Sequence, residues 1–361
     1  MEDDRLEAIE MIGEYANNSA NGIDFVLVCG DMFDTPRISE NLIKKTFKKI
    51  ERIKKPVYVL AGNHEWDGTE CMFATNYFLE NKPANFHVLT KGINCVEGLP
   101  GVDIVAAPLE GKVDQIDLVE AQLDLLEQTT NIRIIAGHGN IDAVVYAGTR
   151  QDPIALRPIE KALSDKKISF AALGDRHSTT KVGDTGAIWY SGAPEPTSFK
   201  EDDQRNILVV EITPGSKPKV DKVEVGQWDF IRLGTKSEQY KLRSRQDLED
   251  LEKRLYAVKK PSKTAIKIYL DSVLDFDTEV GRGNLFDEWE EELFARFEVS
   301  KSSIGARIES DPRNEKAPAG LSSYALSAYE ELKELALSDE EESEIALEAL
   351  KLLTEFAGGN K

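Results

Sequence analysis

The stretch VLVCGD at residues 26–31 joins a short apolar run to a glycine and then to an acidic side chain. A similar pattern recurs as VYVLAGNH at 57–64, IIAGH at 134–138 and FAALGDRH at 170–177. Short apolar runs bounded by glycine predict buried strands of a sheet that is covered on both faces. Ligands of such sheets gather beyond the carboxyl ends of the strands. Three of the four histidines, two aspartates and an asparagine are therefore expected at one sheet edge, which predicts a metal centre.

The composition limits the class of protein. The chain has 361 residues, a hydrophobic fraction of 41% and a net charge of −20. This charge argues against binding nucleic acid by general electrostatics, although bound divalent cations can reverse the local field. No apolar stretch approaches the ~20 residues that span a bilayer, and the acidic start MEDDR is no secretory signal. With three cysteines and no C-x-x-C spacing, we expect a cytoplasmic protein that does not bind membranes.

The first part of the chain alternates helices and strands. An amphipathic helix at 6–16 precedes a strand at 24–29, a helix at 38–54 and a strand at 56–61. This alternation predicts a right-handed crossover and a mainly parallel sheet. The pattern continues with strands at 86–90, 103–106 and 132–136, a helix at 114–128, and later strands at 187–191, 206–213 and 219–225. We expect an α/β fold.

A second block begins near Trp228. Its pattern predicts strands at 228–233, 264–270 and 303–308, with helices at 246–258 and 284–297. Residues 311–320 read as a linker, and 321–357 as one or two acidic amphipathic helices. The predicted domains are therefore 1–225, a small α/β domain at 226–310, and a linker with a helical tail at 311–361. The tail helices either pack onto the main body or dock to a partner.

The ordered motifs Gly30-Asp31-Met32-Phe33-Asp34, Gly62-Asn63-His64-Glu65, Gly137-His138 and Gly174-Asp175-Arg176-His177 resemble those of the calcineurin-like metallophosphoesterases. Within this superfamily the chain looks most like the DNA-repair exonucleases of the SbcD nuclease-subunit type. The similarity extends to about residue 310 and includes the loop WYSGAPE at 189–195. The resemblance implies a core of two packed mixed sheets flanked by helices. It further implies a nuclease domain at 1–225, a capping domain that recognises DNA at 226–310, a homodimer, and an SbcC-like ATPase partner.

The resemblance also implies roles for the strand-end residues. The implied metal ligands are Asp31, which would bridge two metals, Asn63, His138 and Asp175, which would complete one site, and His177, which would bind the other. His64 would act as the acid at the leaving oxygen, oriented by Asp34. Imidazole, amide and carboxylate ligands suit two divalent metals, Mn²⁺ before iron or Zn²⁺. Arg176 either contacts the substrate phosphate or is solvated.

Two departures from the family pattern affect these expectations. Asp175 stands where the family's Gly-His-x-His motif has its first histidine, and this carboxylate should favour harder metals. The family also opens with a strand that carries an Asp-x-His motif, for which this sequence has no counterpart. We therefore expect the site of Asn63, His138 and Asp175 to bind metal better than the site of His177. Without that strand, apolar surface is open or pairs with another chain. The fit of the remaining motifs favours a start upstream of Met1 over a degenerate relative.

The expected function is metal-dependent phosphodiester hydrolysis by a DNA-repair nuclease subunit. One alternative is a phosphoesterase of small substrates, against which the loop at 189–195 and the block at 226–310 argue. The other is a scaffold without catalysis, which the absent opening motif favours. Hydrolysis of bis-(p-nitrophenyl) phosphate, single-stranded DNA and cyclic nucleotides with Mn²⁺ tests the first alternative. Metal content and Mn²⁺-dependent cleavage test the second.

Overall fold

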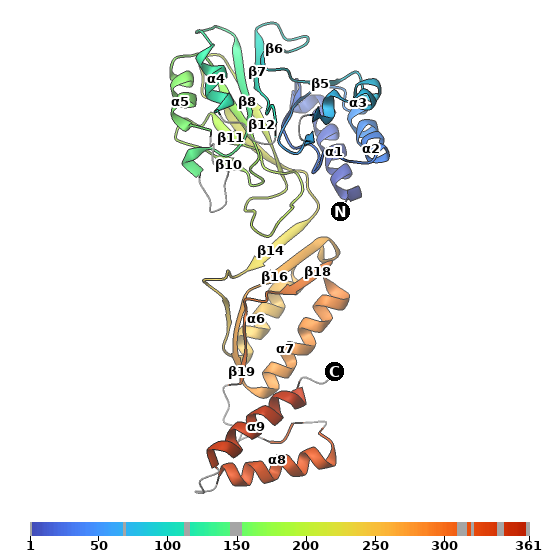
Figure 1. Ribbon diagram of the computed structural model, residues 1–361, viewed down its shortest axis with the longest axis vertical. Helices are drawn as coiled ribbons and strands as arrows, with labels where there is room; N and C mark the ends of the chain where they lie inside the picture. Colours follow the sequence, from blue (N-terminus) through green and yellow to red (C-terminus); the bar gives the residue numbers. More distant parts are fainter. Residues whose placement is uncertain are drawn as a thin grey trace. The chain divides into compact units, whose positions relative to one another are not determined.

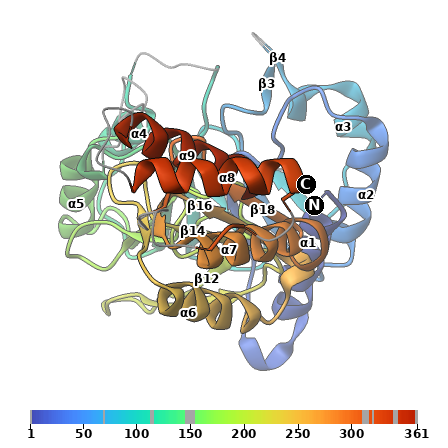
Figure 2. The same cartoon turned by 90° about the horizontal axis from the view of Figure 1, so that it is seen from below.

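A computed structural model (Figures 1 and 2) describes residues 2–67, 70–111, 116–144, 154–308, 316–318, 321–337 and 343–358. The chain divides into two compact units, Met1–Asp229 and Phe230–Lys361. The expected boundary lay at residue 225, and the assignment of catalysis to one unit and DNA recognition to the other stays a prediction. Most of the expected linker at 311–320 lies outside the described residues.

A three-stranded parallel sheet forms one layer of the first unit. Its order is β1-β2-β5, and these strands are Val26–Cys29, Val57–Leu60 and Phe86–Val88. β1 is the edge strand, and its four residues are half-buried. On one side of this sheet lie α1 (Glu2–Asn17), α2 (Glu40–Glu51) and α3 (Asn76–Asn81), as Figure 1 shows.

The helices α1 to α3 cover the sheet because their apolar residues repeat with helical spacing. In α2, Ile43, Phe47 and Ile50 are buried against the sheet core. The side chain of Ser39 accepts a hydrogen bond from Leu42 N at 3.2 Å and thereby begins this helix. Burying each such apolar side chain contributes about 1.5–3 kcal/mol to folding. The crossover through α2 brings β2 parallel to β1.

A six-stranded mixed sheet forms the second layer, in the order β10-β11-β9-β8-β7-β6. Its strands are β6 (Gly92–Cys95), β7 (Val102–Ala107), β8 (Ile132–His138), β9 (Phe170–Gly174), β10 (Thr180–Lys181) and β11 (Ile188–Tyr190). β7, β8, β9 and β11 run parallel, and the two edge strands run antiparallel to their neighbours. The outer face packs against residues of α4 (Leu118–Asp124) and α5 (Leu156–Ser164).

The two sheets pack face to face. Tyr58 and Leu60 of β2 share one buried cluster with Ile104 of β7 and Ala136 of β8. Helices thus cover the outer face of each sheet (Figure 1). This arrangement confirms the expected α/β fold of two packed sheets flanked by helices, and it brings the carboxyl ends of β1, β2, β8 and β9 to one region.

Shorter elements complete the first unit. They are the hairpins β3 (Trp66–Asp67) with β4 (Glu70–Cys71) and β12 (Asn206–Glu211) with β13 (Lys219–Glu224), and 3₁₀ turns at Ser19–Asn21, Met72–Ala74 and Asp142–Val144. The strands of the second hairpin were expected at 206–213 and 219–225. The helix expected at 114–128 spans Leu118–Asp124, and the Asp117 side chain caps its start. Residues 114 and 115 of that expected helix lie outside the described residues.

The second unit contains two three-stranded sheets. One has β14 (Asp229–Leu233), β16 (Thr264–Ile268) and β18 (Arg296–Val299), and the other has β15 (Tyr240–Leu242), β17 (Leu270–Leu274) and β19 (Ile304–Ile308). The helices are α6 (Arg245–Tyr256) and α7 (Phe276–Glu288), with a 3₁₀ turn at Pro261–Lys263 and a π-helical turn at Trp289–Leu293. α8 (Ser323–Ala336) and α9 (Ser343–Gly358) lie side by side (Figures 1 and 2).

Several boundaries in the second unit differ from expectation. The expected strand at 264–270 ends at Ile268, and a separate strand in the other sheet starts at Leu270. The expected helix at 284–297 instead begins at Phe276, because the Asp275 side chain accepts a hydrogen bond from Thr278 N at 3.0 Å. The expected end of this helix at 297 was also wrong, because Arg296–Val299 form a strand. Apolar spacing identified the helix but not the polar side chain that starts it, and it missed the strands Tyr240–Leu242 and Arg296–Val299.

Candidate metal centre

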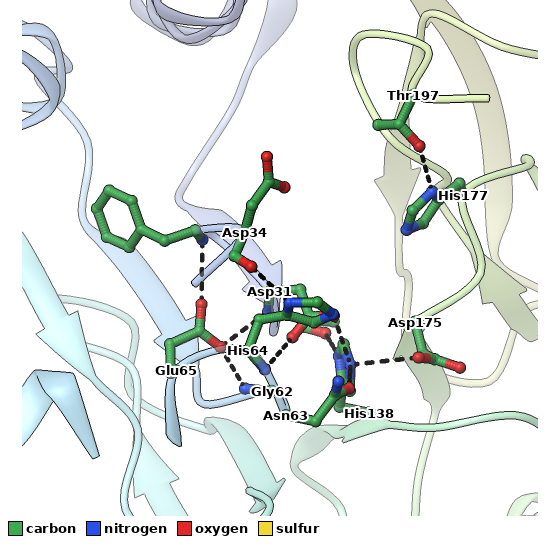
Figure 3. Close-up of polar contacts among 12 residues, drawn as sticks. Asp31, Asp34, Gly62, Asn63, His64, Glu65, His138, Asp175, His177 and Thr197 are labelled. Carbon is green, nitrogen blue, oxygen red and sulfur yellow. Dashed lines mark hydrogen bonds and ion pairs between the residues drawn. The ribbon is translucent and has the colours of Figure 1, made fainter. Parts of the chain in front are cut away.

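Four side chains from four strand ends meet at one edge of the packed sheets (Figure 3). Asp31 follows β1, Asn63 follows β2, His138 is the last residue of β8, and Asp175 follows β9. The possible ligand atoms of Asp31, His138 and Asp175 all lie within 4.8 Å of one another. The structure thus brings together the four side chains that sequence reasoning placed around one cation.

His138 is the centre of this group. Its Nε2 lies 3.1 Å from Asn63 Oδ1, 3.2 Å from Asp31 Oδ2 and 3.7 Å from Asp175 Oδ1. Its Nδ1 lies 2.7 Å from the carbonyl oxygen of Cys29, which can only accept a hydrogen bond. In the neutral ring Nδ1 therefore carries the proton and Nε2 offers a lone pair. One nitrogen and three oxygen donors facing one another fit a divalent cation.

The charges of this group support the same interpretation. Burial lowers the pKa of His138, but the Asp31 carboxylate, with smaller effects of the Cys29 carbonyl and Asp175, raises that pKa overall. For Asp31, burial raises the pKa, and the opposing interactions with His138 lower it below its usual value. The buried donors therefore favour a positive charge between them, which either a proton on His138 or a bound cation supplies.

At this edge the main chain of β9 lies unusually close to the main chain of β1. A Cβ atom on Gly174 would overlap the carbonyl oxygen of Cys29. Asp31 and Asp175 adopt φ values of 52° and 90°, in the left-handed region that non-glycine residues rarely occupy. Such backbone strain is typical of functional sites and persists only where the surrounding structure enforces it.

Glu65 holds two of the loops together and was missing from the predicted site residues. Its side chain is fully buried and accepts hydrogen bonds from the main-chain N–H groups of Gly62 (2.7 Å), Asp31 (3.0 Å) and Phe33 (3.1 Å). Burial raises the pKa of Glu65, and the Asp31 charge adds to this effect. The available signal was an acidic residue directly after a strand-end motif. Glu65 thus links the loop that carries Asp31 to the loop that carries Asn63.

His64 lies beside the group, and its contact with Asp34 differs from the expectation. Its Nδ1 is 2.6 Å from the main-chain oxygen of Asp34, whereas the Asp34 carboxylate forms an ion pair with Arg5. The expectation that the carboxylate orients His64 was therefore wrong, because the helix α1 supplies a guanidinium that attracts it. The other ring nitrogen, Nε2, lies 3.9 Å from Asp31 Oδ2.

His177 lies outside the four-residue group. Its Nδ1 is 2.8 Å from Thr197 Oγ1 and 2.9 Å from Glu201 Oε1. Contact with the Glu201 carboxylate is the largest influence on its pKa, which is raised. In Figure 3 the ring lies between Thr197 and Asp175, with its second nitrogen turned away from Thr197. The structure does not join His177 to the donors around His138, and its role as a ligand of a second metal stays a prediction.

Two further polar residues stand near Asp175. Asn140 donates a hydrogen bond from Nδ2 to Asp175 Oδ2 at 2.5 Å, an arrangement that sequence reasoning missed. Arg176 donates from Nε to Thr180 Oγ1 at 2.5 Å. The contact of Arg176 with a substrate phosphate stays a prediction.

The chain matches one protein-family model. The model of the family described as calcineurin-like phosphoesterase matches residues 2–204, which include all the residues of the site. Among solved structures, the crystal structure of TT1561 of Thermus thermophilus is 12% identical, with a TM-score of 0.37, 62% of this chain covered and 95% of that chain covered. A second crystal structure matches with the same values. At this similarity, neither structure indicates the reaction of this chain.

A search of the described residues for membrane spans gave a negative result. None of their helices combines the length and the apolar character that crossing a bilayer requires.

Proposed function

Because this chain belongs to the calcineurin-like phosphoesterase family, whose members hydrolyse phosphoesters with bound divalent metals, we propose that it is a Mn²⁺-dependent DNA phosphodiesterase. More narrowly, it would be the nuclease subunit of a DNA-repair exonuclease of the SbcD type. The observation that carries this proposal is the buried Nε2 of His138 with three oxygen donors around it. Oxygen donors outnumber nitrogen and no thiolate is present among them, which favours Mn²⁺.

Each residue of the group would have a distinct part. Asn63, His138 and Asp175 would hold one cation, and Asp31 would bridge it to a second position shared with His177. Bound cations would supply positive charge at the phosphoryl oxygens and promote the ionisation of water. The Asp34 carbonyl accepts a hydrogen bond from Nδ1 of His64, so that Nε2 faces the site. When the ring carries a proton on both nitrogens, Nε2 would protonate the leaving oxygen and the ring would return to its neutral form.

The resemblance of residues 226–310 to a DNA-recognition domain supports a polymeric substrate. With a net charge of −20, the chain would bind DNA through its cations and local Lys and Arg residues rather than by general attraction. A homodimer and an SbcC-like ATPase partner belong to the same proposal.

Hydrolysis assays test the proposal directly. Single-stranded DNA, bis-(p-nitrophenyl) phosphate and a cyclic nucleotide would be incubated with the protein, with and without Mn²⁺. We expect Mn²⁺-dependent cleavage of the first two, loss of activity in Asp31→Asn, and a kcat about 10²–10⁴-fold lower in His64→Gln with Mn²⁺ binding retained. Cleavage of the cyclic nucleotide alone would indicate a small-substrate phosphoesterase. No bound Mn²⁺ and no cleavage would indicate a scaffold.

A further inference from the structure

A buried carboxylate supports the exposed histidine of the site. Glu201 lies in the loop after β11, and its side chain is only 6% exposed, whereas that of His177 is 47% exposed. Glu201 Oε1 lies 2.9 Å from His177 Nδ1, and Oε2 accepts a hydrogen bond from Thr197 N at 2.9 Å. The Thr197 hydroxyl contacts both the carboxylate and the ring nitrogen. Hydrogen bonds within the loop therefore hold the carboxylate in place independently of its contact with the histidine.

This contact determines which ring nitrogen of His177 is free. A carboxylate is an acceptor, so Nδ1 of His177 must carry the proton that it donates. In the neutral ring Nε2 is then unprotonated and presents a lone pair. Without the carboxylate, a half-exposed imidazole could carry its proton on either nitrogen and turn about its side-chain bonds. Carboxylates behind histidine ligands fix the tautomer and the ring in this way in metal sites.

We propose that Glu201, together with Thr197, is a positioning residue that fixes His177 as an Nε2 donor for the second metal position of the site. This inference rests on the proposed function, because it presumes a second metal beside Asp31. It assigns a role to the loop at 191–205, which the strand-end motifs do not reach. Glu201 itself would not touch the metal or the substrate.

Glu195 provides a matched control in the same loop. It too is a buried glutamate, with its residue 4% exposed, and its oxygens accept hydrogen bonds from Gln227 N at 2.7 Å and Trp228 N at 3.1 Å. Glu195→Gln and Glu201→Gln each convert the carboxylate to an amide, in which an NH₂ group replaces one oxygen. The two variants should therefore be destabilised to a similar degree, and only one should alter His177.

Mn²⁺ titration of the full chain by calorimetry gives the first measurement. The unmodified protein should show a tighter and a weaker site. Glu201→Gln should weaken the second site by about 10–100-fold and leave the tighter site unchanged. Thr197→Val should have a smaller effect in the same direction, and Glu195→Gln should leave both sites unchanged.

The tautomer of His177 in the metal-free protein gives the second measurement. With only four histidines, ¹⁵N-labelled rings can be resolved by NMR at alkaline pH, and His177→Gln identifies the signal. The unmodified protein and Glu195→Gln should show the proton of His177 on Nδ1, and Glu201→Gln should show a mixture.

The outcomes separate the two proposals. If the protein binds two Mn²⁺ and cleaves DNA, but Glu201→Gln changes neither the weaker site nor the tautomer, the inference about Glu201 is wrong and the proposed function stands. If the unmodified protein binds no Mn²⁺ and cleaves nothing, both are wrong.

Discussion

The two histidines at the sheet edge are held by different means. Both place Nδ1 against an oxygen acceptor and leave Nε2 for the site, but His138 uses the main-chain oxygen of Cys29 and His177 uses side chains of a loop. The His138 side chain has no exposed surface, whereas that of His177 is 47% exposed. One donor is thus part of the packing between two sheets, and the other depends on a few exchangeable side chains. Changes around His138 should therefore affect folding most strongly, and changes around His177 should affect mainly metal binding.

The largest effect is expected from Gly174→Ala, which disturbs the main-chain segment that holds His138. The new Cβ would overlap the Cys29 carbonyl oxygen, so the two sheets would have to separate at the site. We expect a loss of about 4 kcal/mol or more in the free energy of unfolding, measured in urea. As a control, Gly281→Ala in α7 places its Cβ in open space and should stabilise the chain by about 0.5–1 kcal/mol. Similar losses in both variants would contradict the close approach.

Glu65→Ala should have the next largest effect. It leaves three main-chain N–H groups without their acceptor in a buried loop pair, which should cost about 3 kcal/mol of stability and weaken Mn²⁺ binding. Glu70→Ala, at an exposed position of the neighbouring hairpin, should change stability by no more than about 0.5 kcal/mol. A Glu65 variant as stable as this control would show that the loops do not depend on the carboxylate.

Removal of metal should lower stability by a comparable amount. Mn²⁺ at 100 times its Kd should stabilise the folded state by about 2.7 kcal/mol relative to the chelated protein, because the donor group exists only in the folded chain. Thermal unfolding with and without Mn²⁺ measures this difference. Asp31→Asn should abolish most of the shift, and an equal shift in that variant would place the cation elsewhere.

Acidification should weaken Mn²⁺ binding to the group around His138. Burial lowers the pKa of His138, but its interactions with Asp31, the Cys29 carbonyl and Asp175 raise it overall. Below this raised pKa the metal-free site holds a proton that the cation must displace. As pH falls through this raised pKa, the affinity should fall about tenfold per pH unit, and it should level off above that pKa. Calorimetric titration at several pH values measures the slope. A pH-independent affinity would exclude Nε2 of His138 as a ligand.

The smallest effect is expected from Asp34→Asn. This variant removes the exposed ion pair with Arg5 but keeps the main-chain oxygen that contacts His64. Stability should fall by less than about 1 kcal/mol, and kcat should be nearly unchanged. A kcat as low as that of His64→Gln would restore the carboxylate as the orienting group.

The strand-end residues could be predicted from the sequence because their pattern is local. An apolar run, a glycine and a polar side chain identify a strand end, and parallel strands bring such ends together. Asp31, Asn63, His138 and Asp175 were found in this way, and they lie together.

Residues whose partners lie in loops distant in the sequence were harder to predict. Glu65 contacts main-chain N–H groups of two loops, and Glu201 meets His177 across 24 positions of the chain. Nothing in their neighbouring residues specifies these partners. The contact of Asp34 was assigned to the wrong atom for the same reason, since Arg5 lies 29 positions away. In the second unit, the short strands Tyr240–Leu242 and Arg296–Val299 offer too few residues for a periodic signal.

The contact between His138 and the Cys29 carbonyl joins positions 109 residues apart. During synthesis on the ribosome, the loops after β1 and β2 would emerge long before β8 and β9, and a pocket of correct geometry could form only when all four strands have paired. Contacts of such long range are made late in folding. The cation would then bind a nearly finished domain rather than nucleate it, and the appearance of tight Mn²⁺ binding in a refolding experiment should coincide with the last kinetic phase.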